Sequence, residues 1–177
     1  MRPFIRYLKE NTSKPLIGVE VGVKLGENAA NILQNLDIEL LMLVDPWVSY
    51  TNYSLEEKKV GYNKQEVMDS WKKEVYAKFS LEKRVTIFPH SSKFVASMIL
   101  PKAQIDFVYI DAKHTYDSVL EDCKLWYPLI KTDGILCGHD WNNKESGDQI
   151  KKAINEFRVE SKNNNLITIK CDWIIKK

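Results

Sequence analysis

Four ionisable side chains follow two short apolar segments in the second half of the chain. The first segment is 105–110 and the second is 134–138. The four residues are Asp111, His114, His139 and Asp140. Carboxylate oxygens and imidazole nitrogens bind divalent metal ions, and both groups also accept protons. Brought to one place, these residues would make a metal site, a general base, or both.

A strand–helix–strand unit is predicted to bring the four side chains together. Residues 105–110 and 134–138 have the apolar pattern of buried strands, and apolar residues recur at helical spacing over 116–127. A helical crossover makes the two strands parallel, so both end at the same edge of the sheet. Open α/β sheets bind their ligands at that edge. The unit therefore predicts a functional site at the carboxyl ends of its strands.

A glycine-containing turn lies in the first half of the chain. The apolar run 16–21 contains Glu20 and leads into Gly22 and Gly26, and a helix is predicted from Glu27. Glycine allows the main chain to turn sharply and to approach a ligand closely. This strand–turn–helix unit predicts a backbone cradle for a small molecule.

Asp45 ends the next predicted strand, residues 39–44. It lies about 20 positions after Gly26, the distance at which doubly wound folds place the acid that binds ribose hydroxyls. The pattern Glu20-x-Gly22-x-x-x-Gly26 lacks the third glycine of a dinucleotide site. The sequence therefore favours a nucleoside ligand that carries no pyrophosphate.

These motifs together resemble class I S-adenosylmethionine-dependent methyltransferases. The likeness runs from about Ile17 to Trp141 and is closest to the macrocin O-methyltransferase-like branch, which includes sugar- and antibiotic-tailoring enzymes. The segments that carry it are VEVGVKLGENA, LVDPW and IDFVYIDAKHTYDSVLEDCKLWYPLIKTDGILCGHDW. The resemblance implies one doubly wound, mostly parallel Rossmann-like α/β sheet with helices on both faces and an antiparallel C-terminal strand.

The resemblance also implies which residues bind S-adenosyl-L-methionine. The acid and glycines of the first motif hold the amino acid end of the cofactor, the acid after the second strand binds its ribose, and the turn after the third strand lies by the adenine. The expected cofactor-binding residues are Glu20, Gly22, Gly26, Asp45, His90, Ser91 and Asp111. Relatives have Gly-Asp-Ser where this chain has Pro89-His90-Ser91, so His90 replaces an acid expected at the adenine.

A divalent metal site is implied by the same resemblance. Related O-methyltransferases use an aspartate after the fourth strand and an acid pair after the fifth, and the matching positions are Asp111 and His139-Asp140. Imidazole in place of a carboxylate moves the preference from Mg²⁺ toward Mn²⁺, Fe²⁺, Ni²⁺ or Zn²⁺. Asp111 or His114 is then the expected acceptor of the substrate's proton, and imidazole suits this role because its pKa is about 6.5.

The predicted activity is methyl transfer to a hydroxyl of a sugar, a glycoconjugate or a small natural product. Two alternatives stay open. One is a catalytically inactive S-adenosylmethionine-binding module or regulatory homologue. The other is a metal-dependent hydrolase on the same sheet, which gives no role to the glycine turn or to Asp45.

Composition sets the remaining expectations. A chain of 177 residues with 44% hydrophobic and 28% charged residues is typical of one soluble domain, here 1–177. The net charge of +2 and the scattered lysines argue against nucleic acid as a partner, and no apolar run approaches a membrane span. Three cysteines without paired spacing predict a reducing cytoplasm. We expect a small-molecule or glycan acceptor as partner and leave a homo-oligomer open.

The other elements are expected in the family order. Residues 46–64 form a long polar connection rich in tyrosine, which predicts a lid over the site. A capping box at 146–149 is predicted to start the last helix. The further elements are a lead-in helix at 2–10, helices at 65–81 and 94–100, and strands at 84–88, 166–170 and 172–175.

Overall fold

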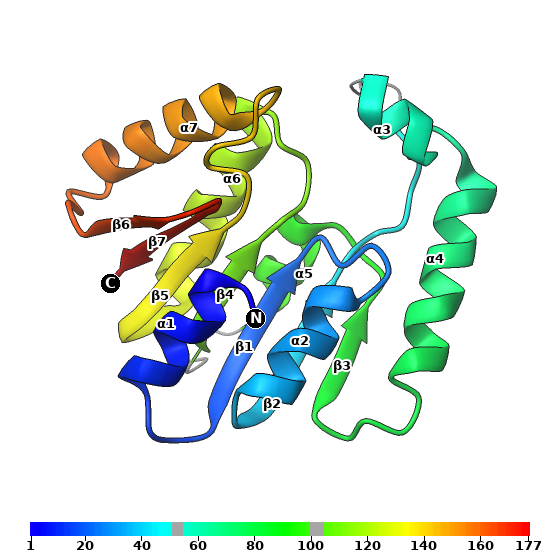
Figure 1. The fold of residues 1–177 in the computed structure, drawn as a ribbon, viewed down its shortest axis with the longest axis horizontal. Helices are drawn as coiled ribbons and strands as arrows, with labels where there is room; N and C mark the ends of the chain where they lie inside the picture. The colour runs from blue at the N-terminus through cyan, green and yellow to red at the C-terminus, as the bar shows by residue number, and fades with distance from the viewer. Residues whose placement is uncertain (51–54, 100–104) are drawn as a thin grey trace.

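The computed structural model describes residues 1–50, 55–99 and 105–177, and within them the chain forms a seven-stranded sheet with helices on both faces (Figure 1). The strands are β1 (Leu16–Val21), β2 (Ile38–Val44), β3 (Val85–Phe88), β4 (Ile105–Ile110), β5 (Ile130–Gly138), β6 (Leu166–Ile169) and β7 (Asp172–Lys176). Their order across the sheet is β3-β2-β1-β4-β5-β7-β6. The first five strands are mutually parallel, and β7 pairs antiparallel with both β5 and β6. The predicted fold class is confirmed.

Helices cover the two faces of the sheet in separate layers. The helices are α1 (Pro3–Asn11), α2 (Glu27–Asn35), α3 (Leu55–Val60), α4 (Gln65–Lys78), α5 (Ser92–Met98), α6 (Tyr116–Trp126) and α7 (Gly147–Glu160), with a 3₁₀ turn η1 (Tyr127–Leu129). Buried residues of α1, α2 and α4 share one core with the sheet, and those of α5, α6 and α7 share another. The strand order reverses between β1 and β4, which is where open sheets of this kind form their ligand crevice.

Alternation along β4 shows how the sequence builds both cores. Phe107 and Tyr109 face the layer of α1, α2 and α4, whereas Val108 and Ile110 face the layer of α5, α6 and α7. All four are at most 4% exposed, because a central parallel strand is covered on both faces. A side chain just beyond Ile110 therefore emerges from a rigid, fully buried strand.

Several predicted boundaries differ from the structure. The helix expected at 94–100 is α5 and begins at Ser92, because the Ser91 side chain accepts the backbone N–H of Phe94 and caps it there. Residue 100 lies outside the described residues. The helix expected at 65–81 ends at Lys78, and the strand expected at 134–138 already begins at Ile130.

The predicted capping box at 146–149 is wrong, although α7 does begin where it was expected. Ser146 makes no capping hydrogen bond with its side chain. Instead Oδ1 of Asn143 accepts the backbone N–H groups of Glu145 and Ser146, at 2.9 and 3.2 Å. The polar groups before α7 are thus satisfied one turn earlier than the motif predicted.

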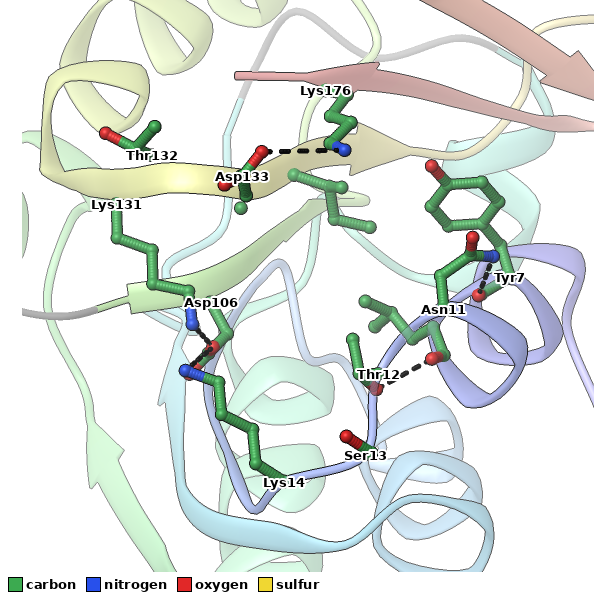
Figure 2. Close-up of a pocket in the computed structure, with 13 residues that line it drawn as sticks. Tyr7, Asn11, Thr12, Ser13, Lys14, Asp106, Lys131, Thr132, Asp133 and Lys176 are labelled. Atoms are coloured by element: carbon green, nitrogen blue, oxygen red, sulfur yellow. Dashed lines mark hydrogen bonds and ion pairs between the residues drawn. The ribbon is translucent and has the colours of Figure 1, made fainter.

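The amino edge of the sheet carries a polar cavity of about 420 Å³ (Figure 2). Asp106 lies in its wall, where its carboxylate pairs with the ammonium group of Lys131 and accepts the backbone N–H of Ile17 at 2.8 Å. This partly buried ion pair ties the start of β4 to β1 and β5, at the end of the sheet opposite the ligand crevice. None of the described helices is both long and apolar enough to span a membrane.

Candidate functional site

A cavity of about 370 Å³ opens at the carboxyl edge of β1, β2 and β4. We call it the carboxyl-edge cavity. Its wall is mainly aromatic and apolar, with acids at two points, and this composition and size are those of a small-molecule site. The aromatic residues of the wall are Trp47, Tyr50, Tyr62 and Trp71, and the acids are Asp45 and Asp111.

Gly22 lets the first motif close against the end of β4. Its φ of +87° lies in the left-handed region, and a Cβ added there would come within 2.4 Å of the Asp111 carbonyl oxygen. Gly22 lines the carboxyl-edge cavity. Gly26 also has a positive φ, +72°, but it lies outside the cavity wall, at the N-cap of α2 beside the Phe79 ring.

Asp45 holds the glycine turn through its carboxylate. Oδ2 accepts the backbone N–H groups of Val23 and Lys24 at 2.9 and 3.0 Å, and Oδ1 accepts that of Trp47 at 2.8 Å. Burial raises the pKa of Asp45, and these three hydrogen bonds oppose that rise. Oδ2 is fully engaged, so Oδ1, with one remaining lone pair, is the atom available to a ligand.

Glu20 lies beneath the cavity rather than in its wall. Its side chain is 1% exposed, and Oε1 accepts a hydrogen bond from Asn28 at 3.1 Å, whereas Oε2 has no hydrogen-bond partner. Burial raises the pKa of this carboxyl group to about 8. Glu20 Oε2 is thus a buried carboxyl oxygen without a hydrogen-bond partner, beside the glycine turn. Such an atom is suited to bind a cationic group of a ligand.

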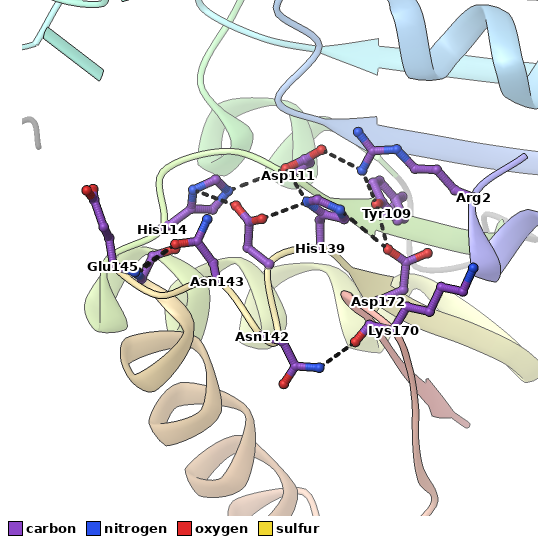
Figure 3. Close-up of polar contacts among 12 residues, drawn as sticks. Arg2, Tyr109, Asp111, His114, His139, Asn142, Asn143, Glu145, Lys170 and Asp172 are labelled. Atoms are coloured by element: carbon purple, nitrogen blue, oxygen red, sulfur yellow. Dashed lines mark hydrogen bonds and ion pairs between the residues drawn. The ribbon is translucent and has the colours of Figure 1, made fainter. Parts of the chain in front are cut away.

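We define the rim cluster as Asp111, His114, His139 and Asp140, of which Asp111 and His114 also line the cavity. Figure 3 shows Asp111, His114 and His139 pointing toward one another. The His114 ring lies between two acids, with Nε2 at 3.4 Å from Asp111 Oδ1 and Nδ1 at 3.3 Å from Asp140 Oδ2. Nδ1 of His139 is 2.8 Å from Asp140 Oδ1. Burial raises the pKa of Asp140, but the hydrogen bond from His139 and the two imidazoles outweigh burial and lower it. The two strand ends thus meet as their parallel arrangement requires.

The donor atoms of the rim cluster fit a divalent cation. One ligand atom from each of Asp111, His139 and Asp140 can be chosen so that all lie within 4.8 Å of one another. Asp140 has a φ of +61°, a conformation that aspartate tolerates better than most residues and that often occurs at functional sites. Two carboxylates and one imidazole form a mixed oxygen and nitrogen set, which suits Mn²⁺, Fe²⁺ or Zn²⁺ as well as Mg²⁺.

Three residues that the sequence analysis did not single out adjoin the rim cluster. Arg2 Nη1 lies 3.1 Å from Asp111 Oδ2 and donates to the Tyr109 hydroxyl at 2.5 Å. Asp172, 0% exposed, lies 3.9 Å from His139 Nε2. The sequence could have indicated Asp172, because it is an acid at the start of an apolar strand. No sequence pattern indicated Arg2.

The turn predicted to lie by the adenine follows the carboxyl end of β3, outside the wall of the carboxyl-edge cavity. His90 is exposed, and its ring packs at 4.9 Å from that of Phe94. Neither His90 nor Ser91 contributes to the wall of the carboxyl-edge cavity, whereas the next residue, Ser92, does. Ser92 also accepts a hydrogen bond from the Trp126 indole at 2.8 Å.

The fold and this site define a class of protein. A doubly wound sheet with a glycine turn after β1, an acid after β2 and a cavity at the switch point is the architecture of nucleoside-binding α/β enzymes. A family model described as a methyltransferase domain matches residues 19–141. The chain belongs to this methyltransferase domain family, whose expected cofactor is S-adenosylmethionine.

Solved structures share the fold at low sequence identity. The O-methyltransferase NovP has a TM-score of 0.68 at 20% identity, covering 98% of this chain and 78% of its own. CalS11, a TDP-rhamnose 3′-O-methyltransferase, has a TM-score of 0.62 at 12% identity, covering 98% and 76%. The SAH-bound methyltransferase PaMTH1 of Podospora anserina has a TM-score of 0.61 at 14% identity, covering 97% and 74%. No curated protein matches the sequence.

Proposed function

We propose that this protein is an S-adenosylmethionine-dependent O-methyltransferase whose rim cluster binds a divalent metal ion. The observation that carries the proposal is the meeting of Asp111, His139 and Asp140 beside the carboxyl-edge cavity. Asp111 belongs to both features, because it lines the cavity and its Oδ1 faces the two histidines. A methyl donor in the cavity and an acceptor at the rim cluster would therefore lie next to each other.

The residues of this chain are proposed to align the reactants and to take a proton. When bound, a divalent ion supplies Lewis acidity that lowers the pKa of an acceptor hydroxyl. S-adenosylmethionine would supply the activated methyl group from the carboxyl-edge cavity and leave as S-adenosylhomocysteine, and His114 would take the proton of the acceptor hydroxyl. The carboxylates of Asp111 and Asp140, each within 3.4 Å of the His114 ring, stabilise the imidazolium that forms.

The acceptor is proposed to be a hydroxyl of a sugar, a glycoconjugate or a small natural product. Support comes from the aromatic wall of the carboxyl-edge cavity, because aromatic rings offer broad apolar contact together with polar atoms at their edges. The fold shared with CalS11, which acts on TDP-rhamnose, is compatible with a sugar acceptor.

The test is a methyl-transfer assay with labelled S-adenosylmethionine and a panel of sugar nucleotides, glycosides and phenols. Each acceptor is assayed with Mn²⁺, with Mg²⁺ and with a chelator. We expect transfer that depends on the metal and is lost in Asp140→Asn, with Asp148→Asn, an exposed residue of α7, as a control that leaves the rim cluster intact. Metal-independent transfer would remove the metal from the proposal. Binding of S-adenosylhomocysteine without transfer to any acceptor would favour the inactive binding module.

A further inference from the structure

Asp172 is a fully buried acid with no place in the wall of the carboxyl-edge cavity. Its Oδ2 accepts the backbone N–H of Phe4 at 3.0 Å, and its Oδ1 accepts the hydroxyl of Tyr109 at 3.4 Å. Burying a carboxylate is costly unless hydrogen bonds or charged partners satisfy it, so the groups that face Asp172 decide what it can do. The third group that faces Asp172 is His139, with Nε2 at 3.9 Å from Oδ1.

The two ring nitrogens of His139 face different acids, and this defines the orientation of the ring. Nδ1 faces the rim cluster, 2.8 Å from Asp140 Oδ1 and 4.0 Å from Asp111 Oδ1, while Nε2 faces Asp172. A metal-binding histidine usually presents one nitrogen to the ion and directs the other toward a carboxylate or carbonyl, which fixes the ring and its tautomer. His139 and Asp172 have this arrangement.

Arg2 contacts Asp111, the second candidate metal ligand, as Asp172 faces His139. Its guanidinium reaches Asp111 Oδ2 at 3.1 Å, which leaves Oδ1 directed at His114 and His139. The same Nη1 atom donates to Tyr109, whose hydroxyl in turn donates to Asp172 (Figure 3). The hydrogen bonds therefore run from Asp111 through Arg2 and Tyr109 to Asp172, and Asp172 Oδ1 lies at ion-pair distance, 3.9 Å, from His139 Nε2.

We infer that Arg2, Tyr109 and Asp172 form a network of positioning residues that orients Asp111 and His139 as metal ligands. This inference rests on the metal site of the proposed function. The network is assembled from both ends of the chain, because Arg2 precedes α1 and Asp172 begins β7. The hydrogen bond from Phe4 to Asp172 joins α1 to β7 at this point.

The inference is tested by titrating Mn²⁺ into the purified protein and following free Mn²⁺ by electron paramagnetic resonance. We expect Arg2→Gln and Asp172→Asn to weaken Mn²⁺ binding by about 10- to 100-fold. Arg2→Lys should recover part of the loss. Arg6→Gln, an exposed arginine in the first turns of α1, is the matched control and should bind like the wild type.

Two further measurements separate positioning from damage to the fold. The affinity for S-adenosylhomocysteine should stay within about twofold in Asp172→Asn, because neither Asp172 nor the groups that it contacts line the carboxyl-edge cavity. In metal-free protein, the ¹⁵N resonances of the His139 ring should change in Asp172→Asn. If Asp172→Asn fails to fold, Arg2→Gln decides alone, since it alters a partly exposed side chain.

The outcomes distinguish this inference from the proposed function. Mn²⁺ binding by the wild type, with unchanged affinity in Arg2→Gln and Asp172→Asn, would overturn the network and leave the metal site intact. Absence of saturable Mn²⁺ binding by the wild type would overturn both. Loss of cofactor affinity in parallel with metal affinity in Asp172→Asn would show general disruption and would also overturn the positioning role.

Discussion

The hydroxyl of Ser92, in the wall of the carboxyl-edge cavity, donates a hydrogen bond to the buried Asp122 at 2.5 Å. This contact joins the start of α5 to the middle of α6. Burial raises the pKa of Asp122 to about 6, although the hydrogen bond from Ser92 opposes the rise. An acid with that pKa makes the stability of the fold depend on pH.

The first prediction follows from the sign of this shift. Because the pKa of Asp122 is higher in the folded state than in the unfolded chain, its contribution lowers the free energy of unfolding as pH rises from about 4 to about 6. Asp122→Asn should remove up to about 3 kcal/mol of this dependence. Urea unfolding between pH 4 and 7 measures this dependence, with Asp117→Asn, an exposed acid on the same helix, as control. Parallel pH curves for wild type and Asp122→Asn would contradict the prediction.

The second prediction concerns Asp45. Asp45→Asn replaces one carboxylate oxygen with a donor that opposes the backbone N–H groups it now binds, so the glycine turn should loosen. We expect about 1–3 kcal/mol of lost stability and at least tenfold weaker binding of S-adenosylhomocysteine by calorimetry. Asp37→Asn, an exposed residue at the other end of β2, should change neither. Unaltered affinity in Asp45→Asn would show that this acid does not support cofactor binding.

The third prediction is proton release from Glu20. Its pKa of about 8 means that the carboxyl group is largely protonated at pH 7. A cationic group of the cofactor placed beside it would favour the carboxylate, so binding should release up to one proton. Calorimetry of S-adenosylhomocysteine binding in buffers of different ionisation enthalpy measures the release. Glu20→Gln should abolish it and exposed Glu27→Gln should not; an equal release in both would exclude Glu20 as its source.

The sequence pattern predicted the residues of the site that follow consecutive strands along the chain. Residues 105–110 become β4 without change of boundary, and His139 follows β5 on the same edge of the sheet. Periodicity and the parallel crossover are enough to bring Asp111 and His139 together. Asp45, expected from the sequence to follow a strand, is likewise placed by the end of β2.

The rest depended on contacts between distant parts of the chain. Arg2 reaches Asp111 only because Phe4 and Ile5 pack α1 against the sheet, and no local motif encodes that docking. The packing of the His90 ring on Phe94 is a second contact that the order of the motifs does not encode. Burial and side-chain direction at such positions are set by tertiary packing, which one sequence does not display.

The fourth prediction concerns the start of the expected lid at 46–64, of which residues 51–54 lie outside the described part of the chain. Gln65 ties this start to α4, since it donates to the Trp47 carbonyl and accepts the Ser49 N–H, both at 2.9 Å. We expect hydrogen exchange over residues 46–50 to slow when S-adenosylhomocysteine binds, because Trp47, Ser49 and Tyr50 line the cavity. Residues of α7 should exchange equally in both states. Equal protection of 46–50 would remove the lid.

The fifth prediction separates the two histidines of the rim cluster. His139→Ala should weaken Mn²⁺ binding, because its Nδ1 is a candidate ligand atom. His114→Ala should keep Mn²⁺ affinity within a few-fold but lower kcat by about 10²–10⁴ and flatten its pH dependence, as expected for loss of a general base. His90→Ala should change neither. Rates measured from pH 5 to 9 at saturating metal decide the assignment.

If Asp111→Ala and Asp140→Ala both keep full activity and an unchanged response to Mn²⁺, the metal-assisted mechanism is wrong, because no other described trio of acids, histidines or cysteines is close enough to hold the ion.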